Sequence, residues 1–218
     1  MTVVKKREKE VFIPAGNLKL AGIFSLPPKP AGVVVFAHGS GSGRLSPRNA
    51  FVAGVLQDAG FATLLFDLLE ESEELDRRKV FDISLLADRL LAGALWLQEG
   101  AESHGLRMGY FGASTGAAAA LQAAAREPKG IAAVVSRGGR PDLAMDYLEK
   151  VKAPTLLIVG GNDRPVIAMN REAFENLKSK KSIVVIPGAT HLFEEPGALD
   201  EVARLAANWF LKHMGPKK

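Results

Sequence analysis

The sequence predicts an α/β domain built on a mostly parallel sheet, and two features lead to this prediction. Short runs of β-forming residues alternate with longer runs of helical pattern, which is typical of parallel sheets covered by helices. The run Val33–Ala37 reads VVVFA and is continuously apolar, as expected of a strand buried on both faces. With 47% hydrophobic and 24% charged residues, the 218-residue chain suits a single domain over residues 1–218 with a sizeable core.

The strands are expected as short apolar runs bounded by Gly, Pro or polar residues. The first two flank Ala15-Gly16-Asn17, which is typical of a hairpin turn. The other six alternate with the helices. The eight expected strands cover Glu10–Pro14, Leu18–Leu26, Val33–Ala37, Phe61–Phe66, Leu106–Phe111, Ile131–Ser136, Pro154–Val159 and Ser182–Ile186.

Helix boundaries are marked by capping and stop residues. The first helix has Ser46 as N-cap, Pro47 at its first position and Gly60 as a stop signal. An alanine-rich run after residue 116 is a strong helix former. The expected helices cover Pro47–Ala59, Asp82–Glu99, Ala117–Ala125, Pro141–Lys150, Val166–Lys178 and Gly197–Lys212, and the acidic stretch Glu70–Asp76 is expected to be a loop.

Composition and charge narrow the possible functions. The net charge of +4 is dispersed, and we expect the basic ends, Lys5–Arg7 and Lys217–Lys218, to be solvated tails and not nucleic-acid arms. The absence of cysteine excludes disulfides, thiolate metal sites and a cysteine nucleophile. Residues 1–10 lack the apolar segment of a secretory signal, and no apolar run is long enough to insert into a membrane. We therefore expect a cytoplasmic protein that is a monomer or homodimer.

The segment Gly112-Ala113-Ser114-Thr115-Gly116 predicts a serine nucleophile on a strand-to-helix turn. A G-x-S-x-G pattern alone is weak, but here it follows an expected strand and precedes the alanine-rich helix. The two glycines remove side chains that would collide in the strained turn around Ser114. Taken alone, a serine in such a turn is more often a helix N-cap.

Two further residues have the positions of catalytic partners. Asp163 follows an apolar strand in Gly160–Pro165, and His191 follows the last strand in Pro187–His191. A serine hydroxyl needs a base to take its proton, and the base needs a group to orient it. Taken alone, Asp163 would be interpreted as a turn former and His191 as a solvated loop histidine. Because parallel strands present their carboxyl ends at one edge, we expect Ser114, Asp163 and His191 to meet there, with Asp163 preferred over Glu194 and Glu195 as the acid.

An oxyanion hole is expected beside this serine. One donor is the backbone N–H of Thr115, at a helix N-terminus. The second is expected from the glycine-rich loop His38–Gly43, with Ser40 preferred. Gly39 and Gly41 are the alternatives and also candidates for contact with the substrate. We expect His38 to hold this loop by hydrogen bonds and not to take part in catalysis.

The same loop, with glycines at 39, 41 and 43, invites a dinucleotide-binding interpretation. A G-x-G-x-x-G fingerprint would need glycine where the chain has Arg44, although Asp67 at the end of the next strand could contact a ribose. This alternative explains neither Ser114 nor His191. No metal-binding motif is present. We therefore expect neither cofactor nor metal.

Four arginines lie near the expected site. Arg137 and Arg140 follow a strand at the site edge, and Arg44 and Arg48 follow the glycine-rich loop. One of them, with Arg137 first, is a candidate for binding a substrate carboxylate. The alternative is that these arginines anchor loops by pairing with Asp67, with Asp142 or with acids of the 70–76 stretch.

These motifs give the chain a resemblance to the α/β-hydrolase superfamily, in particular to its small cap-less dienelactone-hydrolase-like members. The resemblance covers nearly the whole chain and implies an eight-stranded sheet with only the second strand antiparallel, flanked by helices on both faces. It also implies ester hydrolysis through an acyl-enzyme. The short connection Arg137–Val151 leaves no room for a cap domain.

One departure bears on the substrate. Dienelactone hydrolases use a cysteine nucleophile, whereas this chain has Ser114 and no cysteine. This favours a carboxylesterase acting on a small-molecule ester, with short acyl chains at an open site. The alternatives are an acyltransferase with the same three residues and a non-catalytic binding protein on a hydrolase fold.

Overall fold

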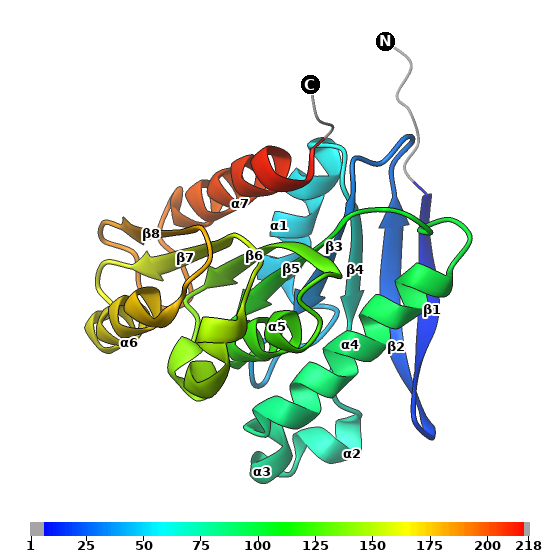
Figure 1. Ribbon diagram of the computed structural model, residues 1–218, viewed down its shortest axis with the longest axis horizontal. Coiled ribbons are helices and arrows are strands. Elements are labelled where there is room, and N and C mark those ends of the chain that lie inside the picture. Colours follow the sequence, from blue (N-terminus) through cyan, green and yellow to red (C-terminus); the bar gives the residue numbers. More distant parts are fainter. Residues whose placement is uncertain (1–6, 216–218) are drawn as a thin grey trace.

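The computed structural model describes residues 7–215, which form an eight-stranded sheet between two layers of helices (Figure 1). The strand order is β1-β2-β4-β3-β5-β6-β7-β8. The strands are β1 (Arg7–Ala15), β2 (Leu18–Leu26), β3 (Val33–Ala37), β4 (Ala62–Phe66), β5 (Met108–Ala113), β6 (Ile131–Arg137), β7 (Thr155–Gly160) and β8 (Lys181–Ile186). The basic stretches at residues 5–6 and 217–218 lie outside the described residues.

Strand β2 is antiparallel to both of its neighbours, β1 and β4, and the other pairs are parallel. The expectation of a mostly parallel sheet with one antiparallel strand is therefore confirmed. The parallel strands end at one edge of the sheet, and the loops that follow them all emerge there.

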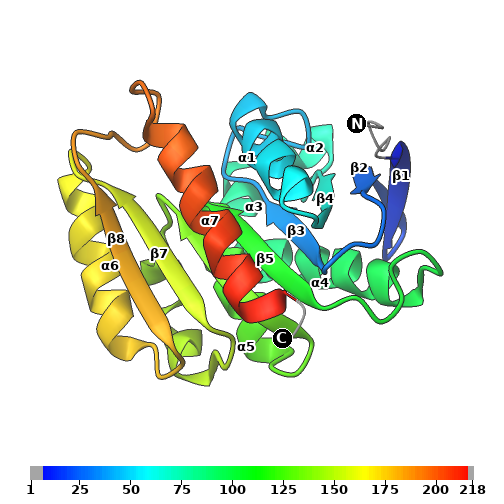
Figure 2. The same cartoon turned by 90° about the horizontal axis from the view of Figure 1, so that it is seen from above.

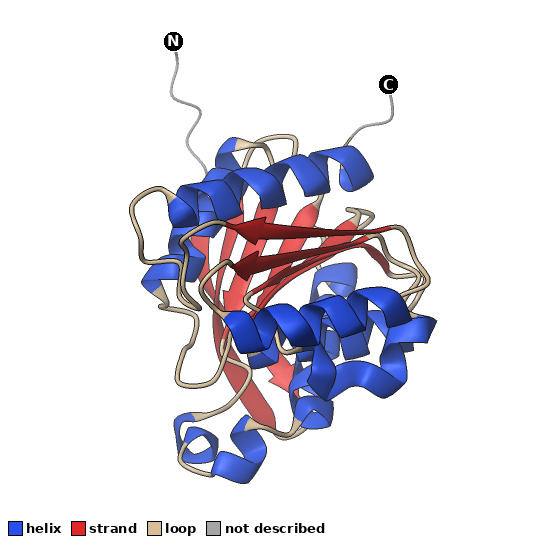
Figure 3. Ribbon diagram, turned by 90° about the vertical axis from the view of Figure 1, so that its left-hand side faces the viewer, coloured by secondary structure: helices blue, strands red, loops and turns tan. Residues whose placement is uncertain are grey.

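Helices cover both faces of the sheet (Figures 2 and 3). Helices α1 (Pro47–Asp58) and α7 (Ala198–Met214) pack on one face. The opposite face is covered by α4 (Ile83–Glu99), α5 (Thr115–Arg126), α6 (Arg164–Asn176) and the 3₁₀ segment η1 (Pro141–Lys150). Strand β6 is joined to β7 only through η1 and short loops, so the prediction that no cap is inserted there is confirmed.

The alternating side chains of the central strands build two cores. On β3, Val33 and Val35 join the core beneath α4 and α5, while Val34 and Phe36 join the core beneath α1 and α7. Each strand is thus buried on both faces, which explains the unbroken apolar run. None of the helices within residues 7–215 is long and apolar enough to cross a bilayer.

The acidic stretch expected to be a loop is partly helical. Helix α2 (Glu71–Glu74) is closed by a capping box between Glu70 and Glu73, and α3 (Arg77–Val80) follows it. Glu73 is buried and also pairs with Lys79 and Arg89. The loop prediction was wrong here because the local capping box is reinforced by the pairing of buried Glu73 with Arg89, which lies 16 residues away in sequence.

Helix α5 approaches the sheet closely at two glycines. A Cβ atom on Gly112 would lie 2.5 Å from Cα of Ala117, in the first turn of α5. A Cβ atom on Gly116 would overlap the carbonyl oxygens of Ala37 and His38 at the end of β3. Backbone atoms cannot move aside cheaply, so the helix can start here only if both positions lack a side chain.

We therefore expect Gly116→Ala to lower the free energy of unfolding by about 3 kcal/mol or more, through overpacking against backbone. Gly54→Ala is the matched control, because Gly54 also lies in a helix but has no atom within 4 Å of an added Cβ. Gly54→Ala should raise the free energy of unfolding by about 0.5–1 kcal/mol. Urea titrations of both variants measure the effect, and equal stabilities would contradict the packing argument.

Candidate active site

Ser114 lies on a strained turn between β5 and α5. Its φ of 51° and ψ of −121° are unusual for a residue with a side chain. The backbone fixes this turn, because the Ser114 N–H donates to the carbonyl of Arg137 at 3.2 Å and its own carbonyl accepts from Arg140 N at 3.1 Å. The residue is half-buried at the carboxyl edge of the sheet, so its hydroxyl is carried on a rigid support.

Asp163 and His191 meet at the same edge. Asp163 follows β7, His191 follows β8, and His191 Nδ1 lies 2.7 Å from Asp163 Oδ2. The aspartate side chain is 14% exposed and the imidazole is 37% exposed. Although Asp163 occupies the N-cap position of α6, it makes no capping hydrogen bond. Its carboxylate is instead turned toward the histidine, and Nδ1 donating to it leaves Nε2 free to accept a proton.

A tight turn at the end of β6 links Ser114 to His191. Arg137 pairs through its backbone with Ser114, and the next residue, Gly138, lies against His191 with a φ of 50°. A Cβ on Gly138 would lie 3.1 Å from the His191 carbonyl oxygen and 3.5 Å from Nδ1. Within residues 7–215 no direct hydrogen bond joins Ser114 Oγ to His191. Such bonds are often long in enzymes without substrate and shorten in the complex.

The histidine loop is held by the two glutamates that were the alternative acids. Glu195 Oε1 accepts from Thr190 N at 3.0 Å, and Glu194 pairs with Arg48 of α1 at 2.9 Å. Neither makes a hydrogen bond to the imidazole in the described part of the chain. Phe193, buried with a φ of 57°, anchors the loop in the core beneath α7. This role of Phe193 could not be predicted from the sequence, because large side chains rarely adopt a positive φ.

The glycine-rich loop after β3 lies directly beside the serine. A Cβ on Gly39 would lie 3.0 Å from Ser114 Cβ, so this position admits only glycine without a shift. The amide of Ser40, the expected second oxyanion donor, donates to Thr115 Oγ1 at 3.1 Å. Gly41 has a φ of 67° and no neighbour within 4 Å of an added Cβ. The loop is thus fastened to the first turn of α5 by the Thr115 hydroxyl, a contact that the sequence did not indicate.

His38 joins the loops that follow β3 and β4. Its Nδ1–H donates to Gly39 O at 3.0 Å, and its Nε2 accepts from Leu68 N at 2.9 Å. Both ring nitrogens are therefore used by backbone, which agrees with the structural role expected for this residue. Burial lowers the pKa of His38 below its ordinary value, against smaller opposing effects of Gly39, Asp67 and Glu74.

The four arginines differ in their partners. Arg44 pairs with Asp67 and Arg140 pairs with Asp142, as the loop-anchor interpretation predicted. Arg48 instead pairs with Glu194.

Arg137 follows neither pattern and has no acidic partner in the described residues. Its side chain lies over the ring of Phe193, the residue is 8% exposed, and its Nε and Nη1 make no hydrogen bond to residues 7–215. Burial, with a smaller effect of the Arg48 charge, lowers its pKa to about 10. Arg137 therefore keeps its positive charge at neutral pH, next to the turn that carries His191.

A pocket of about 500 Å³ opens beside the glycine-rich loop. It is lined by residues 41–48 and by Asp67, Leu69, Glu71 and Glu74. Helix α2 thus forms one wall of this pocket. Within residues 7–215 no three carboxylate or histidine side chains gather closely enough to hold a metal ion.

The depressed pKa of His38 predicts a pH dependence of stability. In the unfolded chain His38 is protonated near pH 6.5, whereas in the folded chain it is protonated only at lower pH. The free energy of unfolding should therefore fall as the pH drops below 6.5. This residue contributes at most about 1.4 kcal/mol per pH unit. We expect wild type to lose more stability than His38→Gln between pH 7 and pH 5 in urea titrations. An NMR titration midpoint of His38 at or above 6.5 would contradict the prediction.

Several known proteins are similar to this chain. A dienelactone hydrolase from Anabaena variabilis has a crystal structure with a TM-score of 0.93 and 56% identity, covering 96% of this chain and 99% of that one. Est1E from Butyrivibrio proteoclasticus has the same fold, with a TM-score of 0.81 at 17% identity over 94% of this chain and 98% of that one. These likenesses agree with the α/β-hydrolase fold expected from the sequence.

A curated relative has a different name. A Mycobacterium tuberculosis protein, provisionally named a phosphoribosyl transferase, is 57% identical over 211 residues, which are 96% of this chain. The chain spans only 48% of that protein's length.

The model of the dienelactone hydrolase family matches residues 20–214, nearly the whole of the described structure. This chain therefore belongs to the dienelactone hydrolase family and has the α/β-hydrolase fold.

Proposed function

We propose that this member of the family is a serine carboxylesterase that cleaves small-molecule esters through an acyl-enzyme. The observation that carries the proposal is the 2.7 Å contact between His191 and Asp163 at the edge where Ser114 is held at positive φ. An oriented imidazole beside a serine on a strained turn is the arrangement that activates a hydroxyl. Family membership supports hydrolysis, and the serine in place of cysteine supports an ordinary ester as substrate.

The proposed reaction has two halves. Ser114 Oγ attacks the ester carbonyl carbon while His191 Nε2 takes the hydroxyl proton, and Asp163 stabilises the imidazolium that forms. The C–O bond to the alcohol then breaks, and His191 returns the proton to the departing alkoxide. In the second half, water attacks the acyl-enzyme with His191 again as base, which releases the acid and restores Ser114.

The oxyanion would be held by backbone amides at the start of α5 and in the loop after β3. Thr115 N–H is the first donor, at the positive end of the helix. Ser40 N–H is the proposed second donor, and its hydrogen bond to the Thr115 hydroxyl must be shared or released when negative charge develops on the substrate. Gly39, whose backbone lies against Ser114, is the alternative donor.

Ser114→Ala should lower kcat/KM for p-nitrophenyl butyrate by at least about a thousandfold, because the acyl-enzyme can no longer form. Ser182→Ala, near the start of β8 and outside the loops of the site, is the control and should change the rate by less than about twofold. Circular dichroism should show both variants folded. Retention of activity within about tenfold in Ser114→Ala would rule out the proposed nucleophile.

Arg137 is proposed to recognise a negatively charged group of the substrate. Its guanidinium is buried next to the His191 turn, and two of its nitrogens, Nε and Nη1, make no hydrogen bond within the described residues. An unpaired buried charge is unfavourable, and a carboxylate held in a fork by Arg137 would remove that cost.

We expect Arg137→Gln to lower kcat/KM about 10- to 100-fold for a p-nitrophenyl hemisuccinate, the loss typical of a hydrogen bond to a charged group. The rate with neutral p-nitrophenyl butyrate should change far less. Arg140→Gln is the control, because Arg140 already pairs with Asp142. Equal losses with both esters would show that Arg137 only supports the histidine loop.

A further inference from the structure

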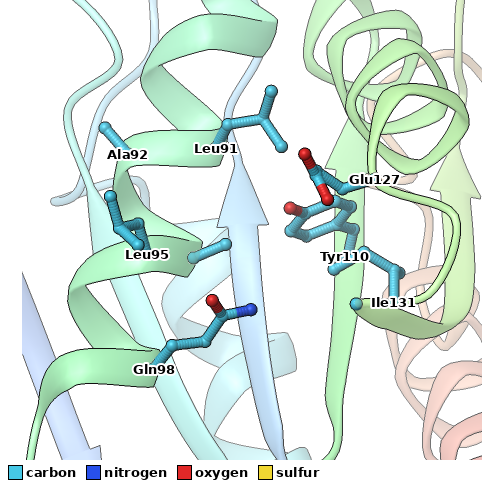
Figure 4. Close-up of a pocket in the computed structure, with 9 residues that line it drawn as sticks. Leu91, Ala92, Leu95, Gln98, Tyr110, Glu127 and Ile131 are labelled. Atoms are coloured by element: carbon cyan, nitrogen blue, oxygen red, sulfur yellow. The ribbon is translucent and has the colours of Figure 1, made fainter.

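A second pocket lies on the face of the sheet covered by α4 and α5, far from the catalytic loops. It has a volume of about 320 Å³ and lies between α4, the end of α5 and strands β5 and β6 (Figure 4). Slightly more than half of its wall is apolar, and this part consists of Leu91, Ala92, Ala94, Leu95 and Ile131. The polar groups are contributed by Tyr110, Glu127 and Gln98.

This pocket is separate from the proposed active site. Tyr110 precedes Ser114 by four positions on β5, which is about 13 Å along an extended strand. Glu127 follows the last residue of α5, whereas Thr115 begins that helix. Twelve helical residues span about 18 Å, so the pocket and the nucleophile lie at opposite ends of the same strand and helix. None of the proposed catalytic residues lines the pocket.

Tyr110 buries a hydroxyl that no described residue satisfies. Its side chain is fully buried, and Oη makes no hydrogen bond to any group in residues 7–215. Phenylalanine would fill the same space without burying an unpaired hydroxyl, which is unfavourable. Burial raises the pKa of Tyr110, with a smaller contribution from Glu127, so the hydroxyl keeps its proton and can donate it.

Glu127 supplies an acceptor beside this donor. In Figure 4 its carboxylate and the Tyr110 ring lie close together, facing α4 across the pocket. Glu127 is exposed, and no cation in the described part of the chain pairs with it, because Arg126 pairs with Asp88 instead. The pocket thus presents a buried donor and an outer acceptor at one end of an apolar wall.

We propose that this pocket binds a compact apolar molecule that carries one hydroxyl group. A hydroxyl can accept from Tyr110 Oη–H and donate to the Glu127 carboxylate at the same time, whereas its apolar part contacts the leucine and isoleucine side chains. The volume lies at the low end of small-molecule sites and suits one ring. The ligand class is therefore a small aromatic or alicyclic alcohol.

Benzyl alcohol is the probe. Toluene is the matched analogue that lacks the hydroxyl group, and benzylamine is the one that carries an amine in its place. Chemical-shift changes in ¹H–¹⁵N spectra of the full chain report both affinity and location. We expect benzyl alcohol to bind with a Kd on the order of 1 mM and to shift the amides of Leu91, Leu95, Gly130 and Ile131. Toluene and benzylamine should bind at least about threefold more weakly.

Variants separate recognition of the hydroxyl from simple filling of the pocket. Tyr110→Phe removes only the hydroxyl and should weaken benzyl alcohol about three- to tenfold while leaving toluene unchanged. Glu127→Ala should weaken benzyl alcohol by a similar factor. Glu99→Ala, which removes another exposed carboxylate, should have no effect.

Ala92→Phe places a ring in the pocket and should abolish binding of both benzyl alcohol and toluene. An unchanged pattern of amide resonances away from α4 shows that this variant is folded. Shift changes confined to the Ser114 and His191 loops, equal affinity for benzyl alcohol and toluene, tighter binding of benzylamine, or an unchanged Kd in Tyr110→Phe would each overturn the proposal.

Discussion

The close approach of α5 to the sheet is the constraint on which the rest of the site depends. With no side chain at Gly112 or Gly116, the first turn of the helix rests on the backbone of β3 and β5. At this junction Ser114 has a positive φ, and Thr115 lies against the loop after β3. One packing requirement therefore fixes the candidate nucleophile, the helix N-terminus and the neighbouring amides together.

Around this fixed point, the remaining polar groups are arranged by loops from different strands. His38 joins the loops after β3 and β4, and Glu194 and Glu195 hold the loop that carries His191. Arg44, Arg48 and Arg140 each pair with a carboxylate, whereas Arg137 has no acidic partner among residues 7–215. Buried polar groups without partners are uncommon in proteins, and in this chain Arg137 and Tyr110 are two such groups that a ligand could satisfy.

Sequence reasoning predicted the order of strands and main helices, because apolar runs, caps and glycine stops are local signals. It also predicted that Asp163 and His191 lie at the same edge of the sheet, and in the structure a hydrogen bond joins them there. It missed helix α2, the Thr115 hydroxyl contact and Phe193, since these depend on partners distant in sequence or on a rare backbone conformation. The pocket at Tyr110 could not be predicted from a sequence motif, because four separate elements contribute residues to its wall.

The central claim is that the strand-to-helix turn between β5 and α5 makes the Ser114 hydroxyl a nucleophile. The most direct measurement is reaction of the purified protein with a fluorophosphonate, followed by intact mass and peptide mapping of the adduct. We predict a single stoichiometric adduct on Ser114. An unmodified protein, or an adduct on another residue, would contradict the claim.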